Sequence, residues 1–419
     1  MRGRKVQLRC KALRSPNKRG CDNKGLRSSP LLPIFLIVLV DILGLTMLMP
    51  MLPFYAKTLG ASATQVGLLL AVYALCQLIA GPPLGKLSDR FGRKPVLLVS
   101  QLGTFIGFLI LASATTLWMA FLSRIIDGLT AGNLTVAQAY ISDVTKPKDR
   151  AKSFAVIGIA FGVGFLIGPA ATAQIASQFG DKYAIYAAAG LSALSIVATL
   201  TLLPRHPVRP ALEPGEDEGP VAPGGERLGL TDWAAYLEYF KRPGLAPILW
   251  QFFCFAVSFA LYTGGFALFA AQRFGYGTTQ VAHLMTYAGF LGVILQGGLI
   301  GRLVKQFGES KLLVAGFAFM SASCVAFGFG FSFAAMIFAT TLMAGSGTIR
   351  PVVSSLISQK AGRHEQGVVI GLTQSLASVA QIIGPILAGA LIQNHLLYTW
   401  AFVAAGVAAM GLMIEVNRS

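Results

Sequence analysis

The stretch GKLSDRFGRK (85–94) crowds five charges into nine positions of a chain that is only 12% charged. A related stretch, GRLVKQFGES (301–310), follows 216 positions later. A Gly-Pro pair at 168–169 recurs at 384–385 with the same offset. LGASATQVGLLL (59–70) also resembles FGYGTTQVAHLM (274–285). The chain is therefore built from two copies of one unit, each about half its length.

Both copies consist mostly of long apolar runs. The chain has 419 residues, of which 54% are hydrophobic, and a mean hydropathy of +0.66. A transmembrane helix needs about 20 mostly apolar residues. Runs of this kind lie at 31–56, 64–84, 95–114, 117–140, 153–175, 183–203, 245–270, 280–300, 311–331, 332–356, 367–391 and 397–415. They are too long for barrel strands and lack strict alternation, so we expect helices.

The runs predict an all-α polytopic membrane protein with twelve transmembrane helices in two six-helix pseudo-repeats. Its expected parts are a basic cytoplasmic tail (1–30), an N-terminal half (31–203), a cytoplasmic linker (204–244) and a C-terminal half (245–416). The linker is rich in Pro, Gly and acidic residues, which predicts a solvated, flexible segment. Its TDWAAYLEYFKR sequence predicts a short amphipathic helix on the membrane surface.

The net charge of +17 is distributed unevenly along this topology. Of the 34 Lys and Arg residues, 29 lie in the tail, the linker and alternate loops, all on one side of the membrane. This positive-inside pattern places both termini in the cytoplasm. We expect no nucleic-acid partner, because no basic folded domain is present to hold one.

The sequence indicates no metal or disulfide chemistry. Its five cysteines are scattered and odd in number, and its four histidines are dispersed without ligand spacing. Residues 1–30 are basic and nearly free of acid, which is compatible with a transit peptide. A disordered cytoplasmic tail or an over-extended translation start is the preferred interpretation.

The charged stretch closely resembles the signature of the loop between spans two and three in the major facilitator superfamily. The pattern consists of Gly85, Asp89, Arg90, Gly92, Arg93 and Lys94. It most resembles the drug/proton antiporter branch with twelve spans, which includes tetracycline and multidrug efflux transporters. DILGLTMLMPMLP (41–53), LSRIIDGLTAGN (122–133) and GIAFGVGFLIGP (158–169) resemble motifs of the first, fourth and fifth spans.

The resemblance implies a conformational latch at 85–94. Gly85 would permit close helix approach, and Asp89 would face the N-terminal end of a helix in the other half. Arg90, Arg93 and Lys94 would hold the turn in the cytoplasm. For Arg90 and Lys94, a simple positively charged turn explains the sequence equally well.

Four charged residues stand out because they lie well inside predicted spans, where an unpaired charge costs at least a few kcal/mol. They are Asp41, Arg124, Asp127 and Arg350. We hypothesise that Asp41 binds the proton and that Arg124 is its switchable partner, roles that the resemblance supports. Asp127 is either a second titrating acid or a structural partner of Arg124, since the two are three apart on one helix face. Arg350 would bind an anionic substrate or pair across the halves.

Polar residues in the spans predict a water-filled cavity between the halves. Two stripes have helical spacing: Tyr73 with Gln77, and Gln374 with Ser378 and Gln381. Interhelical hydrogen bonding is the alternative explanation. The remaining candidate cavity residues are Asn133 and Gln138.

The fifth-span motif resembles the one that marks exporters. Its residues Gly158, Gly162, Gly164, Gly168 and Pro169 would allow a helix bend. The chain also departs from the tetracycline group, because Gly107 stands where those proteins carry an acid and the ninth span has no acid. This weakens an assignment to tetracycline–metal chelates in particular.

These features predict a proton-coupled secondary transporter that exports drugs or other small amphipathic molecules by alternating access. Its expected setting is a bacterial inner membrane, where it would act as a monomer with no cofactor beyond the proton gradient. The alternatives are a proton-coupled metabolite or sugar transporter and a non-transporting sensor. An enzyme is not expected, because the sequence has no catalytic dyad, nucleophile elbow or P-loop.

Overall fold

The computed structural model describes residues 31–145, 150–204, 238–330, 332–360 and 366–418. The predicted tail at 1–30 lies outside this part of the chain, as does most of the predicted linker, including residues 231–237 of its expected surface helix. Every regular element in the described residues is a helix. The predicted helical membrane fold is thereby confirmed.

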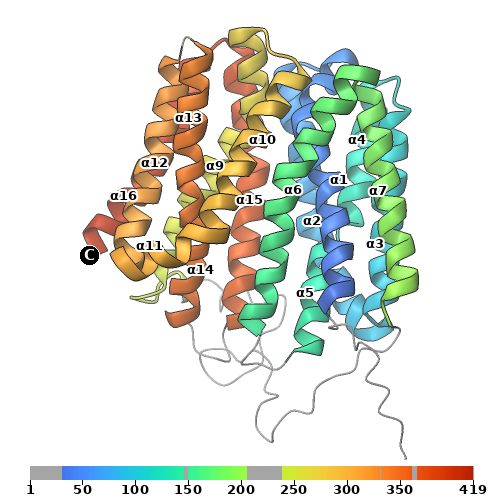
Figure 1. Ribbon diagram of the computed structural model, residues 1–419, viewed down its shortest axis with the longest axis horizontal. Coiled ribbons are helices and arrows are strands. Elements are labelled where there is room, and N and C mark those ends of the chain that lie inside the picture. The colour runs from blue at the N-terminus through green and yellow to red at the C-terminus, as the bar shows by residue number, and fades with distance from the viewer. Residues whose placement is uncertain (1–30, 146–149, 205–237, 331, 361–365, 419) are drawn as a thin grey trace, which may run out of the picture.

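The helices form two groups that lie side by side in Figure 1. We call the end of the molecule at which α1 begins the lower end, as drawn there, and the opposite end the upper end. The first group is α1 (Leu31–Thr58), α2 (Ala63–Phe91), α3 (Arg93–Ala112), α4 (Leu117–Leu129), α5 (Asn133–Val144), α6 (Arg150–Phe179) and α7 (Asp181–Leu202). The second is α9 (Ala246–Phe274), α10 (Thr278–Ile294), α11 (Ile300–Phe307), α12 (Glu309–Phe329), α13 (Phe333–Gly345), α14 (Ile349–Lys360), α15 (Gln366–Gln393) and α16 (Leu397–Arg418).

Eleven helices of the described chain are long and apolar enough to cross a membrane. Two of them contain irregular turns: a π-helical turn at Leu295–Leu299 joins α10 to α11, and a 3₁₀ turn at Ser346–Thr348 joins α13 to α14. The chain is therefore a multi-pass membrane protein.

The predicted continuous helix at 117–140 is wrong. The structure divides this span into α4 and α5, with a break at Thr130–Gly132. At the break, the backbone N–H of Ala131 donates to Gly128 O and that of Gly132 donates to Thr130 O, in place of bonds four residues back. The Thr130 hydroxyl also donates to Ile126 O. Together, α4 and α5 run from the upper to the lower end and supply the remaining crossing (Figure 1).

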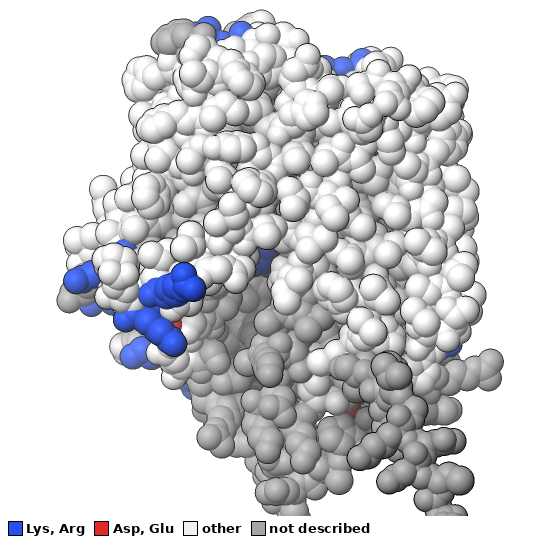
Figure 2. Space-filling view, viewed as in Figure 1, with Lys and Arg blue, Asp and Glu red and all other residues white. Residues whose placement is uncertain are grey.

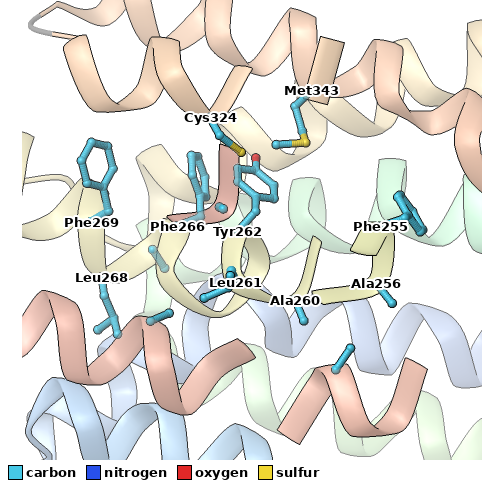
Figure 3. Close-up of a cluster of buried hydrophobic side chains, with 14 of the residues drawn as sticks. Phe255, Ala256, Ala260, Leu261, Tyr262, Phe266, Leu268, Phe269, Cys324 and Met343 are labelled. Carbon is cyan, nitrogen blue, oxygen red and sulfur yellow. The ribbon is translucent and has the colours of Figure 1, made fainter. Parts of the chain in front are cut away.

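The interior of the second group is apolar and strongly aromatic (Figure 3). Tyr262, Phe266 and Phe269 of α9 all pack on the ring of Phe327 of α12, with ring centroids 5.5–6.4 Å apart. Trp400 of α16 packs on Phe269 and donates its indole N–H to Leu261 O. Inside a bilayer, van der Waals contact and satisfied hydrogen bonds of this kind hold helices together. These aromatic side chains therefore pack closely against one another inside the second group.

The two groups meet closely toward the upper end. An added Cβ at Gly67 of α2 would strike the backbone of Pro385 in α15, and one at Gly389 of α15 would strike Ala63. Small residues of this kind let membrane helices approach closely. The Thr64 N–H donates to Gln393 Oε1 at 3.0 Å, and the Thr278 hydroxyl donates to Asp181 Oδ2 at 3.0 Å.

The same helices separate toward the lower end. An added Cβ at Gly81 of α2 or Gly371 of α15 would meet no atom within 4 Å. Figure 2 shows a recess between the two groups in this part of the molecule, with cationic side-chain atoms visible inside it. The space between the groups is thus closed above and widens below.

Candidate functional site

An ion pair lies inside the first group. On α4, the Arg124 guanidinium lies 3.1 Å from Asp127 Oδ2, and both side chains are almost fully buried. The rings of Tyr73 and Phe108 each lie 5.7 Å from the guanidinium carbon. Thr104 of α3 is a hydrogen-bonding neighbour of Asp127. Of the two roles considered for Asp127, this geometry matches that of a structural partner of Arg124.

Glycines bring the neighbouring helices against this pair. Gly128, next to Asp127, leaves room for the backbone of Tyr73 in α2. Gly107 of α3 would place a Cβ 3.1 Å from Asp127 Cβ. The position at which the resemblance led us to expect an acid is thus filled by a glycine that packs on Asp127. The Asp127 segment of α4 is thus packed against both α2 and α3.

Asp41 lies on α1 and is not joined to Arg124 by an ion pair in the described structure. Its polar neighbours are instead the neutral side chains of Gln101 on α3 and Ser195 on α7. Asp41 Oδ2 is buried and accepts no hydrogen bond. The predicted pair of Asp41 and Arg124 is therefore not formed in this conformation.

Gln101 and Ser195 are site residues that the sequence did not reveal. Gln101 is fully buried, and its Nε2 donates to Ser195 Oγ at 2.7 Å. The available signal was the amide itself, because a Gln within an apolar span needs a partner in another helix. The partner is 94 positions away, so the sequence could not identify it.

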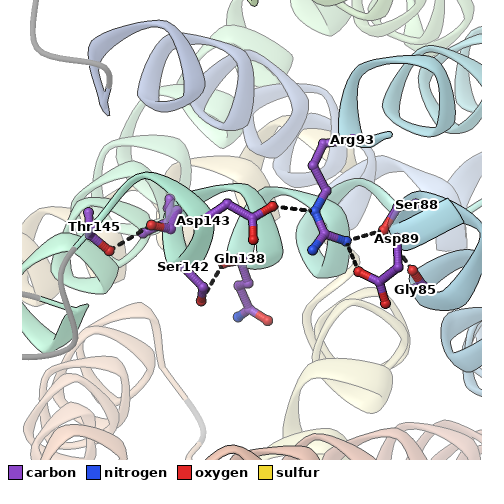
Figure 4. A network of polar contacts seen from close by, with 9 residues as sticks. Gly85, Ser88, Asp89, Arg93, Gln138, Ser142, Asp143 and Thr145 are labelled. Atoms are coloured by element: carbon purple, nitrogen blue, oxygen red, sulfur yellow. Dashed lines mark hydrogen bonds and ion pairs between the residues drawn. The ribbon is translucent and has the colours of Figure 1, made fainter. Parts of the chain in front are cut away.

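The charged stretch at 85–94 forms a network at the lower end (Figure 4). The Arg93 guanidinium donates to Asp143 Oδ2 of α5 at 2.8 Å and to Ser88 Oγ at 2.6 Å, and it lies 2.5 Å from Asp89 Oδ1. The Asp89 side chain is 65% exposed. The latch contact expected for Asp89 with the other half is thus replaced here by a pair within its own half.

This stretch is not the turn that the sequence suggested. Helix α2 continues through Gly85 and Asp89 to Phe91, and only Gly92 separates it from α3. Gly92 has φ +95° and ψ 157°, a conformation that only glycine adopts readily. A Cβ added at Gly85 would meet one described atom within 4 Å outside its own helix, the methyl carbon of Thr135 at 4.0 Å.

The two other basic residues of the stretch have separate roles. The Arg90 guanidinium lies 5.4 Å from the ring centroid of Phe91. The Lys94 ammonium donates to Leu200 O and Leu203 O at the end of α7. A lysine in this position satisfies carbonyls that a helix C-terminus leaves free. Lys94 is therefore a helix cap as well as a basic residue of this loop.

The second copy of the unit has a similar arrangement with different charges. Gly308 stands 216 positions after Gly92 and also has positive φ, +81°. Glu309 occupies the position that matches Arg93, and its carboxylate accepts from Ser355 Oγ at 2.6 Å and from Gln359 Nε2. The repeat thus keeps the one-residue turn and a polar bridge between the corresponding helices.

The glycines of the fifth-span motif face different neighbours. Added Cβ atoms at Gly164 and Gly168 would strike Ile42 and Thr46 of α1, whereas one at Gly158 would meet nothing. The Thr46 hydroxyl donates to Gly164 O at 2.9 Å. Gly162 faces Val293 of α10 at 3.6 Å, and α6 continues as one helix through Pro169. The motif therefore holds α1 against α6.

The predicted cavity residues are dispersed. Arg350, at the start of α14, is exposed and lies 6.0 Å from the ring centroid of Phe161 in the other group, with no ion-pair partner among the described residues. Gln374 and Gln381 are exposed, whereas Ser378 is buried and donates to Gln374 O.

On the first group's side, Tyr73 packs on Arg124, and half-buried Gln77 follows one turn later on α2. Asn133 Oδ1 is buried and has no hydrogen-bond partner. Gln138 lies beside the lower-end network (Figure 4). The described residues contain no cluster of three metal-ligating side chains.

Comparison with known proteins identifies the family to which this chain belongs. The sequence model of the Major Facilitator Superfamily matches residues 34–302 and 297–416. The tetracycline resistance protein of class B from Escherichia coli is 31% identical over 368 residues, covering 87% of this chain and 88% of that protein. Multidrug resistance protein 2 of Bacillus subtilis is 28% identical over 392 residues, covering 90% and 93% of the two chains.

Solved structures agree with the fold. The human organic anion transporter MFSD10 superposes with a TM-score of 0.69 at 21% identity, covering 92% of this chain and 98% of that one. The nucleoside transporter NupG gives a TM-score of 0.70 at 15% identity, covering 93% and 99%. The chain belongs to the Major Facilitator Superfamily.

Proposed function

We propose that this protein is a proton-coupled transporter that exports amphipathic drugs or similar small molecules. The family membership makes it a transporter, and relatives named for tetracycline and multidrug resistance align over most of its length. Their names support drug export as the direction and substrate class. Since one chain supplies both groups of helices, it is expected to work as a monomer.

One observation carries the coupling mechanism: Asp41 is an acid inside an apolar span with a buried, unpartnered oxygen. An ionised carboxylate in such a place lacks the hydrogen bonds that it would have in water. Binding a proton removes its charge, and losing the proton restores it. Asp41 is therefore the group proposed to exchange a proton for substrate, with the proton gradient as the energy source.

Alternating access is supported by the shape of the space between the groups. It is closed by packed glycines and hydrogen bonds above and widens below. Among the described residues, basic side chains gather where helices begin or end at the lower end, as at 86–94, 241–242 and 302–311, and loops rich in Lys and Arg are expected in the cytoplasm. We therefore assign the lower end to the cytoplasm of an inner membrane, with both termini there, and this conformation to the cytoplasm-open state.

The proposal is tested by substrate accumulation in a bacterial host that lacks its own efflux pumps. Cells that express the protein should retain less tetracycline or less of a lipophilic dye cation than cells with empty vector. A protonophore should abolish this difference. Equal retention across a panel of both compound classes would contradict drug export, and a difference that survives the protonophore would contradict proton coupling.

A further inference from the structure

The polar contacts around Asp41 connect three helices. Gln101 of α3 is completely buried and donates its side-chain Nε2–H to Ser195 Oγ of α7 at 2.7 Å. The Ser195 hydroxyl in turn lies 3.5 Å from the carbonyl oxygen of Ile37, one turn before Asp41 on α1. Both Gln101 and Ser195 are neighbours of the Asp41 carboxyl.

Two atoms in this cluster lack a partner. Asp41 Oδ2 and Gln101 Oε1 are both buried, both are hydrogen-bond acceptors, and neither receives a donor. Buried polar atoms are almost always paired, so two unpaired acceptors on adjacent side chains need an explanation. Two acceptors cannot satisfy each other without a hydrogen between them.

Two arrangements leave neither of these two atoms unpaired. If Asp41 carries a proton, its O–H donates to Gln101 Oε1, Gln101 Nε2 donates to Ser195, and Ser195 donates to the Ile37 carbonyl. If Asp41 is ionised, a half-turn of the amide makes Nε2 donate to the carboxylate, and the Ser195 hydroxyl then donates to Oε1. An amide can make this exchange because its two ends have the same shape and opposite hydrogen-bonding character.

We infer that Gln101 is a positioning residue whose amide turns as Asp41 gains or loses its proton, with Ser195 as the second member of the relay. The inference rests on the proposed function, because it concerns the same proton. A change in the protonation of Asp41 on α1 would then change hydrogen bonds on α3 and α7. The bonds from Gln101 Nε2 to Ser195 Oγ and from Ser195 Oγ to Ile37 O are those of the first arrangement.

Other charged groups near Asp41 are few. Asp127 of α4, paired with Arg124, acts electrostatically on Asp41, and Tyr73 of α2 lies near all three. The titratable residues of α6, Arg150 and Lys152, belong to its first turn, and those of α3 and α7 lie within the first two turns of each helix. The further titratable residues on helices that contact α1 are Cys76, Lys86, Asp89 and Arg90 of α2, and Tyr140, Asp143, Cys254, Tyr262, Arg273, His283 and Tyr287.

The test is infrared difference spectroscopy of the purified full-length protein in lipid as a function of pH, without substrate. The carboxylic C=O band of Asp41 is identified by its loss in Asp41→Asn. Gln101→Met keeps the side-chain length but cannot donate a hydrogen bond to the carboxylate. In this variant the midpoint of the band should therefore move to higher pH by about one unit, which is a tenfold change in proton affinity. Ser195→Ala should move it less in the same direction.

Ser192→Ala is the matched control. Ser192 is equally buried on α7, but its hydroxyl donates to the backbone carbonyl of Gln101 rather than to the amide. This variant should leave the midpoint unchanged. If Gln101→Met should fail to fold, Gln101→Asn shortens the side chain while keeping the amide, and the same upward shift is expected because the amide no longer reaches the carboxyl.

Three results would overturn the inference: an unchanged midpoint in a folded Gln101 variant, an equal shift in Ser192→Ala, or no band assignable to Asp41. Isotope-labelled glutamine should also show an amide band that changes with the same midpoint. Because this assay contains no drug, a positive result in a protein that exports no drug would refute the proposed substrate while leaving the relay intact.

Discussion

At the residue scale, the interior charges of the first group are neutralised in two different ways. Arg124 and Asp127 are buried as a pair 3.1 Å apart, with two aromatic rings around the guanidinium. The hydrogen-bonding neighbours of Asp41, Gln101 and Ser195, are neutral, and the charged residue that acts on it, Asp127, is itself an acid. A proton is therefore the direct means of neutralising Asp41, whereas Asp127 already has a permanent counter-ion. On this difference rests our proposal that Asp41, and not Asp127, is the coupling acid.

Removal of Asp127 should destabilise the protein. Asp127→Asn leaves the Arg124 guanidinium buried without its counter-ion, which typically costs about 3–5 kcal/mol. The melting temperature of the purified variant in detergent should fall, and the double variant Arg124→Gln with Asp127→Asn should recover much of the loss. A single variant that melts like wild type would show that the pair is not structural.

The sequence predicted some of these residues and not others for a physical reason. Arg124 and Asp127 are three apart on one helix, so their spacing alone permits the pair. Gln101 depends on Ser195, which reaches it only when α3 and α7 pack together. Charge inside an apolar run is visible in a sequence, whereas the neutral partners of that charge are set by tertiary contacts.

At the scale of the helices, hydropathy located the spans but not their interruptions. The turn between α2 and α3 is the single residue Gly92, and the fourth crossing breaks at Thr130–Gly132. Both features concern backbone geometry, to which a count of apolar residues is insensitive. The glycines of α6 were likewise expected to bend the helix, and the structure places two of them against α1.

A pair of substitutions separates these two roles for the α6 glycines. Gly168→Val should push α6 away from Thr46 and abolish a monodisperse, folded product on size-exclusion chromatography. Gly158→Val should leave folding unaffected, because nothing lies within 4 Å of its added Cβ. Equal effects at both positions would contradict packing against α1 as the role of the motif.

At the scale of the whole molecule, the two groups are closed together above and apart below. Thr64 and Gln393 join them at the upper end, and Gly67 and Gly389 let α2 and α15 touch there. At the lower end, Asp89 is exposed, and its ion-pair partner among the described residues is Arg93 of its own group. Transport by alternating access requires the upper contacts to open while the lower end closes.

A cross-link should lock the molecule in this conformation. In a background without native cysteines, Thr64→Cys with Gln393→Cys should react with a short reducible bis-thiol linker. Drug export should then stop and should return after reduction. The same linker on either single variant should have no effect. Export that continues at full rate through a complete cross-link would contradict opening of the upper end.

Proton coupling through Asp41 is tested most directly by drug-stimulated proton movement in respiring everted vesicles, whose cytoplasmic face is outside. Addition of a transported drug to wild-type vesicles should release protons from the acidified lumen. Asp41→Asn should abolish this release, and Asp181→Asn, which alters an acid at the upper end, should leave it largely intact. An undiminished signal in Asp41→Asn would contradict the account, because coupling would then reside elsewhere.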